Sequence, residues 1–276
     1  MDDDGTAAGF FARLRERIER VDGVVSVGLD PDPDRLPAFL DGSDLPRWAF
    51  NRRVIDATHE HAAAFKPNAA FYEDADGWRA LRETVAYAHG KGVPVVLDAK
   101  RADVGNTARQ YARSVADLGA DAVTVNPYMG RDSLAPFLDA DLGVFVLCRT
   151  SNAGGADLQD RELAAGGTVY ERIARLAADW NERENVGLVV GATAPDELAA
   201  IRDLVPDLPF LVPGVGAQGG DAEAAVEYGL AGGVGLVNSS RGIIFAGEGA
   251  DDEAAYFRAA GAAARRLRRR LERHRG

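Results

Sequence analysis

The chain has 276 residues, of which 46% are hydrophobic and 27% charged, a composition typical of a globular protein with a large core. Its 32 basic and 43 acidic residues leave a formal net charge of −11, which argues against a nucleic-acid or anionic-membrane partner. The single cysteine excludes an internal disulfide and a cysteine-rich metal site, and no apolar run reaches the roughly 18 residues of a membrane span.

The chain starts with the acidic stretch MDDDGTAAGFF, where a secretory signal would carry basic residues. We therefore expect a cytoplasmic protein without a membrane partner. A short helix is expected near this end, before the first predicted strand.

Eight short apolar runs follow, and each is succeeded by a helical pattern. They show no polar alternation, as expected of parallel strands whose two faces are both covered. The predicted strands are Val24–Asp30, Ala63–Asn68, Val93–Ala99, Ala122–Pro127, Gly143–Thr150, Val186–Ala192, Pro209–Gly214 and Gly233–Ser239.

Eight strands alternating with eight helices over about 250 residues predict an α/β protein with the (β/α)8 TIM-barrel fold. A doubly wound open sheet is the alternative, but it usually has fewer strands and a glycine-rich first turn, which VGLDPDP is not. No linker or repeat divides the sequence, so we expect a single barrel domain over residues 1–276. This domain would end in a basic helix that carries ARRLRRRLERHRG.

Polar residues gather at the carboxyl ends of the predicted strands, which form the active face of a TIM barrel. Their convergence predicts an open polar mouth rather than charges buried in a core. The polar residues and the proline at these ends are Asp30, Lys66, Asp98, Lys100, Asn126, Thr150, Ser151, Pro213, Asn238 and Arg241.

The third strand runs into the charged stretch VVLDAKRADVGNTA, Val95 to Ala108. Side chains of an extended strand repeat every second residue, so Asp98 and Lys100 are expected on one face. With Lys66 at another strand end, they predict an array of alternating charges that keeps Lys100 protonated and the carboxylates ionised. Lysine is scarce here, at three of 32 basic residues, and unlike arginine it can give up and regain a proton.

Two glycine- or arginine-bearing loops follow the last two strands, at the position where TIM barrels often bind phosphate. Glycines in PGVGAQGG, residues 213–220, would let backbone N–H groups approach phosphate oxygens. Arg241 in NSSRGI, residues 238–243, can bind a phosphate dianion with two parallel hydrogen bonds. The two loops together predict a phosphate-bearing substrate.

The stretch VVLDAKRADVGNTA resembles, without a gap, the signature of the orotidine 5'-monophosphate decarboxylases: apolar residues, D-x-K-x-x-D, then Val/Ile-Gly-x-Thr. PGVGAQGG and NSSRGI are similar to the two phosphate loops of that family, and GLDP and FKPN to its first two strand ends. The resemblance runs from about Val24 to Phe245 and is closest to the longer bacterial and archaeal subgroup. It implies decarboxylation of orotidine 5'-monophosphate to uridine 5'-monophosphate, which is the last step of de novo pyrimidine nucleotide synthesis.

The resemblance also implies roles for the charged residues. Asp98 would lie against the C6 carboxylate of the substrate, and Lys100 would deliver a proton to C6 as carbon dioxide leaves. Lys66 and Asp30 would contact ribose hydroxyls, with Lys66 also supporting Asp98. The implied catalytic set is Lys100, Asp98, Asp103 and Lys66.

Further residues would bind substrate, some of them across a subunit boundary. Asp103 and Thr107 would reach into the neighbouring subunit's site, which implies a homodimer with shared active sites. Ser151 would hold the pyrimidine edge, and Gln218 would bridge base and phosphate as its loop closes. The implied substrate-binding set is Asp30, Thr107, Ser151, Pro213, Gln218, Gly219 and Arg241.

The resemblance implies no metal and no organic cofactor, and the sequence contains no ligand cluster for either. Three alternatives remain open at this point. A Mg²⁺-dependent sugar-phosphate decarboxylase or aldolase of the same superfamily shares D-x-K-x-x-D. A Schiff-base aldolase could use Lys100 or Lys66 as a desolvated nucleophile. A nucleotide-binding barrel that has lost turnover would bind nucleotide without releasing carbon dioxide.

Overall fold

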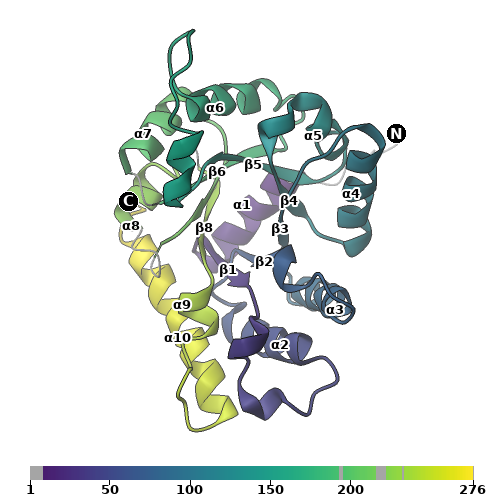
Figure 1. Ribbon diagram of the computed structural model, residues 1–276. Coiled ribbons are helices and arrows are strands. Elements are labelled where there is room, and N and C mark those ends of the chain that lie inside the picture. The colour runs from purple at the N-terminus through teal and green to yellow at the C-terminus, as the bar shows by residue number, and fades with distance from the viewer. Residues whose placement is uncertain (1–8, 193–194, 216–221, 232, 276) are drawn as a thin grey trace, which may run out of the picture.

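In the computed structural model, parallel strands form a barrel that is surrounded by helices (Figure 1). The structure describes residues 9–192, 195–215, 222–231 and 233–275. Over these residues eight strands are present, which confirms the predicted (β/α)8 fold. They are β1 (Val25–Leu29), β2 (Ala64–Pro67), β3 (Val96–Arg101), β4 (Ala122–Val125), β5 (Gly143–Arg149), β6 (Val186–Val190), β7 (Phe210–Pro213) and β8 (Gly235–Ser239).

The helices alternate with the strands, and short 3-10 helices η1 to η5 occur in the connecting loops. Within the described ranges, none of the helices is long and apolar enough to cross a membrane. The α-helices are α1 (Phe10–Val21), α2 (Pro46–Thr58), α3 (Gly77–Gly90), α4 (Gly105–Leu118), α5 (Arg131–Leu138), α6 (Val169–Asp179), α7 (Pro195–Leu204), α8 (Ala222–Glu227), α9 (Arg241–Ile244) and α10 (Glu253–Glu272). The 3-10 helices are η1 (Pro33–Arg35), η2 (Ala38–Leu40), η3 (Ala69–Phe71), η4 (Pro127–Met129) and η5 (Ala153–Asp157).

The strand order is β2-β1-β8-β7-β6-β5-β4-β3, and neighbouring strands in this order are parallel. The barrel closes between β2 and β3 through the isolated bridges Phe65 to Val95 and Asn68 to Asp98. This junction, here named the β2/β3 seam, is therefore less regular than the ladders between the other neighbours.

Helix α1 covers the amino-terminal end of the barrel. Its Phe10 ring packs edge-on against Phe145 of β5, with 6.1 Å between the ring centroids. The Arg17 guanidinium donates to the carbonyl of Ala62, just before β2, and Arg13 pairs with Asp121, just before β4. One end of the barrel is thus closed, and the carboxyl ends of the strands remain as the mouth.

The strand interiors are buried on both faces, as their continuous apolar sequences predict; every residue of β1 and β6 is buried. The boundaries of β3 were predicted less well. The apolar pattern indicates Val93–Ala99, whereas the strand runs from Val96 to Arg101. The reason is a register shift against β4 between Leu97 and Arg101, which carries the strand on through its charged residues.

Candidate active site

A cavity of about 180 Å³ lies at the carboxyl ends of β1, β2, β3, β7 and β8. It brings together five residues of the implied catalytic and substrate-binding sets, which come from the ends of β1, β2, β3 and β7 and from the start of α9. The lining residues are Asp30, Lys66, Asn68, Asp98, Pro213, Gly214, Val215, Asn238, Ser239, Ser240 and Arg241. The convergence of charged residues in this cavity marks it as the candidate active site.

Asp98 is the centre of the charged cluster and binds one lysine with each carboxylate oxygen. The Lys66 ammonium donates to Asp98 Oδ2 at 2.7 Å, and the Lys100 ammonium donates to Oδ1 at 2.5 Å. The Lys66 side chain is only 5% exposed, while that of Lys100 is 46% exposed. Lys100 does not line the cavity itself. Its ammonium group is bound to the carboxylate of Asp98, which does line the cavity, so Lys100 lies at the rim.

Burial and charge oppose each other in this cluster. Burial raises the pKa of Asp98, but the Lys66 and Lys100 ammonium groups outweigh it and hold that pKa well below its usual range. Burial would likewise lower the pKa of Lys66, but Asp98 and Asp30 outweigh it and leave that pKa above its ordinary value. The pairing therefore favours the carboxylate form of Asp98 and the ammonium form of Lys66.

Lys100 meets Asp98 for a different reason from the one that strand alternation suggests. The two side chains meet as predicted, but Lys100 has φ +50°, in the left-handed region, so the expectation that an extended backbone brings them together was wrong. A non-glycine residue in this conformation costs on the order of 1–2 kcal/mol, and such strain persists only when surrounding contacts hold it. Here the Lys100 N–H donates to the hydroxyl of Thr124 on β4 at 2.9 Å.

The opposite side of the cavity is built by the ends of β7 and β8. Arg241 begins α9 directly after β8, and the hydroxyl-bearing Ser239 and Ser240 precede it. Gly28 of β1 makes this approach possible, because a Cβ there would lie 1.8 Å from the Ser240 hydroxyl oxygen. The result is a hydroxyl-rich wall with one guanidinium, which suits a phosphate group.

Besides Lys100, three residues of the implied catalytic and substrate-binding sets lie outside this cavity. Asp103 is partly exposed and accepts from the N–H of Val104 at 2.7 Å, and Thr107 is exposed in the first turn of α4. Ser151 lies against the end of β6, where a Cβ on Gly191 would lie 2.9 Å from the Ser151 Cβ. Two more, Gln218 and Gly219, fall outside the described residues.

A second charged cluster at the end of β5 was not predicted. Arg149 follows a register shift in β5, is 12% exposed at its side chain, and pairs with Asp160 and Glu197. The Gln159 side chain accepts from the Thr150 N–H at 2.9 Å and donates to the Thr150 hydroxyl at 2.9 Å. Together these contacts hold the backbone that leads into Ser151.

Asn68 and Thr124 were also missed as site residues. Asn68 lines the cavity and ends the quoted FKPN stretch, so its place at a strand end was a usable signal. Thr124 was visible as the polar residue inside the apolar run AVTV of β4. A hydroxyl in a fully buried strand is costly unless it is hydrogen-bonded, which should have directed attention to its partners.

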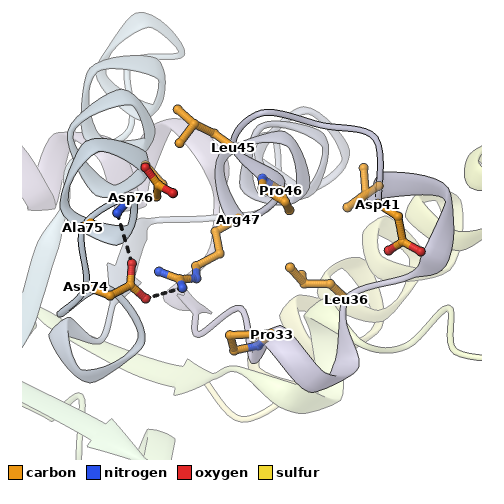
Figure 2. Close-up of a pocket in the computed structure, with 11 residues that line it drawn as sticks. Pro33, Leu36, Asp41, Leu45, Pro46, Arg47, Asp74, Ala75 and Asp76 are labelled. Atoms are coloured by element: carbon orange, nitrogen blue, oxygen red, sulfur yellow. Dashed lines mark hydrogen bonds and ion pairs between the residues drawn. The ribbon is translucent and has the colours of Figure 1, made fainter.

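A larger pocket, of about 650 Å³, lies between the loop after β1 and the start of α3 (Figure 2). Figure 2 shows its Arg47 guanidinium turned toward Asp74, with which it forms an ion pair. Its other lining is largely apolar, with Leu36 and Leu45 among the residues. It lacks the alternating charges of the smaller cavity, so size alone does not identify the reactive site.

Across the part of the chain that the structure describes, no group of three or more His, Cys, Asp or Glu side chains is arranged to hold a metal ion.

Residues 23–256 match the model of the Orotidine 5'-phosphate decarboxylase / HUMPS family. The orotidine 5'-phosphate decarboxylase of Natronomonas pharaonis is 73% identical over 269 residues, which cover 96% of this chain and 99% of that protein. The protein of the same name from Halorubrum lacusprofundi is 71% identical over 276 residues, again covering 96% and 99%. The similarity therefore extends over nearly the whole length of both partners in each comparison.

The fold is also shared with solved structures. Leishmania donovani OMP decarboxylase matches with a TM-score of 0.82 and 42% sequence identity, covering 97% of this chain and 99% of that one. Leishmania donovani UMP synthase matches with a TM-score of 0.83 and 43% identity, covering 98% of this chain and 57% of that chain.

Proposed function

The chain belongs to the Orotidine 5'-phosphate decarboxylase / HUMPS family, and on this premise we propose that it converts orotidine 5'-monophosphate into uridine 5'-monophosphate and carbon dioxide. This is the last step of de novo pyrimidine nucleotide synthesis, and in our proposal it proceeds without a cofactor. Since nucleotide synthesis supplies the cell interior, we assign the protein to the cytoplasm.

The observation that carries the proposal is the Asp98 carboxylate held between Lys66 and Lys100 at the cavity. Such a carboxylate cannot relieve a neighbouring negative charge by taking up a proton, because the two ammonium groups keep it ionised. A substrate carboxylate placed against it is therefore repelled. Two carboxylates about 4 Å apart repel by about 4 kcal/mol at an effective dielectric constant of about 20.

Repulsion of this size corresponds to roughly three powers of ten in rate, which is a small part of the barrier to forming a vinyl carbanion. The larger part is assigned to Lys100. As the bond from C6 to the carboxylate breaks, its electron pair stays on C6, and the nearby ammonium stabilises the developing charge. One Lys100 proton then passes to C6, carbon dioxide leaves, and the resulting neutral amine regains a proton from water.

The phosphate is assigned to the wall formed by Arg241 and the loop that starts at Pro213. Binding energy from this non-reacting group can hold the pyrimidine against Asp98 in spite of the repulsion. Lys66 and Asp30 are assigned to the ribose, and Ser151 with Gln218 to the base. Gly219 belongs to the same phosphate loop in this proposal.

The other candidate functions fit less well. Lys66 remains an ammonium, because Asp98 and Asp30 raise its pKa, and an ammonium is not a nucleophile for a Schiff base. A sugar-phosphate substrate is disfavoured because the relatives at 70% identity and above are named for orotidine 5'-phosphate. The intact charged array argues for turnover over nucleotide binding alone.

We further propose that the active enzyme is a homodimer in which Asp103 and Thr107 complete the site of the partner. Neither residue lines the cavity of its own chain. Val104, which follows Asp103 in the chain, is 56% exposed, and Tyr128 and Met129, which follow the neighbouring strand β4, are 78% and 44% exposed. Exposed apolar side chains beside unassigned polar ones support a contact with a second copy.

The function is tested by following the loss of orotidine 5'-monophosphate absorbance, with and without a chelator. We expect turnover that is insensitive to the chelator. Absence of turnover with this substrate, or turnover of a sugar phosphate that stops when metal is removed, would refute the proposal.

The shared site is tested by mixing inactive Asp98→Ala and Asp103→Ala proteins. If each site takes Asp98 from one chain and Asp103 from the other, equal mixing restores at most about a quarter of the sites. No recovery of activity, with exchange of subunits verified, would contradict the proposed dimer.

A further inference from the structure

Strand β3 carries extra residues at the position of Asp98 and Lys100, and one residue of β4 faces them. Leu97 pairs with Val123 and Arg101 pairs with Val125, so Asp98, Ala99 and Lys100 stand opposite Thr124 alone. A bulge of this kind leaves backbone N–H groups without their usual strand partners. Because these groups are partly or fully removed from water, they need acceptors from elsewhere.

The Thr124 hydroxyl supplies those acceptors. It accepts from the Ala99 N–H at 3.0 Å and from the Lys100 N–H at 2.9 Å, and it donates to Asp98 Oδ1 at 2.9 Å. A hydroxyl has one hydrogen to donate and two lone pairs, so its capacity is fully used by these contacts. Thr124 is 1% exposed and sits in a strand whose other residues are apolar and buried.

One hydroxyl therefore touches all three residues of the bulge. It fixes the left-handed backbone of Lys100 and, at the same time, the carboxylate oxygen to which the Lys100 ammonium is bound. We propose that Thr124 is a positioning residue of the decarboxylation site, which sets the place of the Lys100 ammonium relative to Asp98. This inference rests on the proposed function, since it concerns how the same two groups are held for that reaction.

Two variants separate the hydroxyl from the bulk of the side chain. Thr124→Val keeps the shape and removes the hydroxyl, while Thr124→Ser keeps the hydroxyl and removes a methyl group. We expect Thr124→Val to lower kcat by roughly ten- to a hundredfold with KM changed by less than about threefold, because displacement of a reacting group acts on the chemical step. Thr124→Ser should retain kcat within about threefold of the wild type.

The matched control is Thr58→Val in α2. Thr58 is also fully buried, and its hydroxyl donates to the Val54 carbonyl one turn earlier in the helix. We expect this variant to lose some stability and to keep both kcat and KM. A fall in kcat as large as that of Thr124→Val would show that loss of any buried hydroxyl has this effect, and would overturn the proposal.

If Thr124→Val does not fold, Thr124→Ala and Thr124→Ser replace it as a pair, because both lack the methyl group and they differ only in the hydroxyl. The expected ratio of their kcat values is again roughly ten or more. Equal kcat values in this pair, or an unchanged kcat in a folded Thr124→Val protein, would overturn the assigned role.

Amide hydrogen exchange gives a readout that does not depend on turnover. Loss of the acceptor should speed exchange at Ala99 and Lys100 by about tenfold or more in Thr124→Val, with no change there in Thr58→Val. Unchanged exchange at both amides would refute the positioning role even if the wild type decarboxylates orotidine 5'-monophosphate. Conversely, the wild type could lack this activity while Thr124→Val exchanges faster at both amides. That result would refute the proposed function, but it would support the hydrogen bonds by which Thr124 holds the Lys100 backbone.

Discussion

The ends of β3 and β5 both break the register of the sheet and both carry a basic residue, yet the two side chains lie in different surroundings. Lys100 on β3 is bound to one carboxylate, which lines the cavity, and its own side chain is 46% exposed. Arg149 on β5 is 12% exposed and is surrounded by acceptors from the following loop and from α7. A charge at a strand end is therefore available for chemistry only when its partners leave part of it open to a ligand.

The largest expected effect in this comparison comes from removing the open charge. Lys100→Ala should lower kcat by at least about a thousandfold, because it removes both the proton donor and the stabilising charge at C6. Binding of uridine 5'-monophosphate, measured by calorimetry, should change by less than about tenfold. Turnover at the wild-type rate would contradict the role assigned to Lys100.

Removing the buried lysine of the same cluster should affect both stability and turnover. Lys66→Met leaves Asp98 with Lys100 as its remaining cationic partner, so we expect a loss of about 2–3 kcal/mol in urea unfolding and a lower kcat. Lys91→Met is the control, since Lys91 pairs with Asp56 on the protein surface and should matter little to either measurement. Equal losses in the two variants would contradict the special position of the β3 cluster.

Removing the enclosed charge of β5 should act on binding instead of chemistry. Arg149→Met loosens the backbone that leads into Ser151, so KM should rise by roughly tenfold while kcat stays within about threefold. Arg131→Met, which removes an exposed pair with Glu182, is the control and should leave both constants unchanged. A large fall in kcat with KM unchanged would mean that Arg149 acts on the reaction itself. That result would contradict the distinction between Arg149 of β5 and Lys100 of β3.

The smallest expected effect concerns pH. Asp98 has a lowered pKa in the folded protein, so its contribution to stability is present above the ordinary carboxylate pKa of about 3.9 and is lost as pH falls below it. Lys66 has a raised pKa, so its contribution is present below about pH 10.4 and is lost as pH rises above it. The stability difference between the wild type and the double variant Lys66→Met/Asp98→Asn, in which neither position titrates, should thus be flat from pH 5 to about pH 9. A change within that window, seen in urea unfolding, would argue against this charge state.

The fold was predictable because the strands of this barrel are continuous apolar runs, and burial on both faces permits little else. The cavity residues Asp30, Lys66, Asp98, Pro213 and Arg241 were predictable because carboxyl ends of parallel strands meet at one face. Strand periodicity could not predict the backbone conformation of Lys100. Its left-handed conformation depends on the register against β4 and on a hydroxyl 24 residues away in the chain.

The ion pairs of the β5 cluster could not be predicted from the local sequence either. Nothing near Arg149 in the sequence indicates that Asp160 and Glu197 will enclose it, since those partners come from a long loop and from a separate helix. For Asp103 and Thr107 the resemblance to the family, and not any local pattern, supplied the expectation. A single chain leaves them at its surface, and the role that we propose for them depends on contacts between chains.

The β2/β3 seam is the place where we expect the strands of the barrel to separate most easily. The ion pair of Lys66 with Asp98 crosses the place where the ring of strands is joined by isolated bridges. Any fluctuation that parts these strands also pulls the reactive charges away from each other. A bound nucleotide that contacts both strands would hold them together. We therefore expect the β2/β3 seam to open before the rest of the barrel in the protein without nucleotide, and after the rest of the barrel in the protein with nucleotide bound.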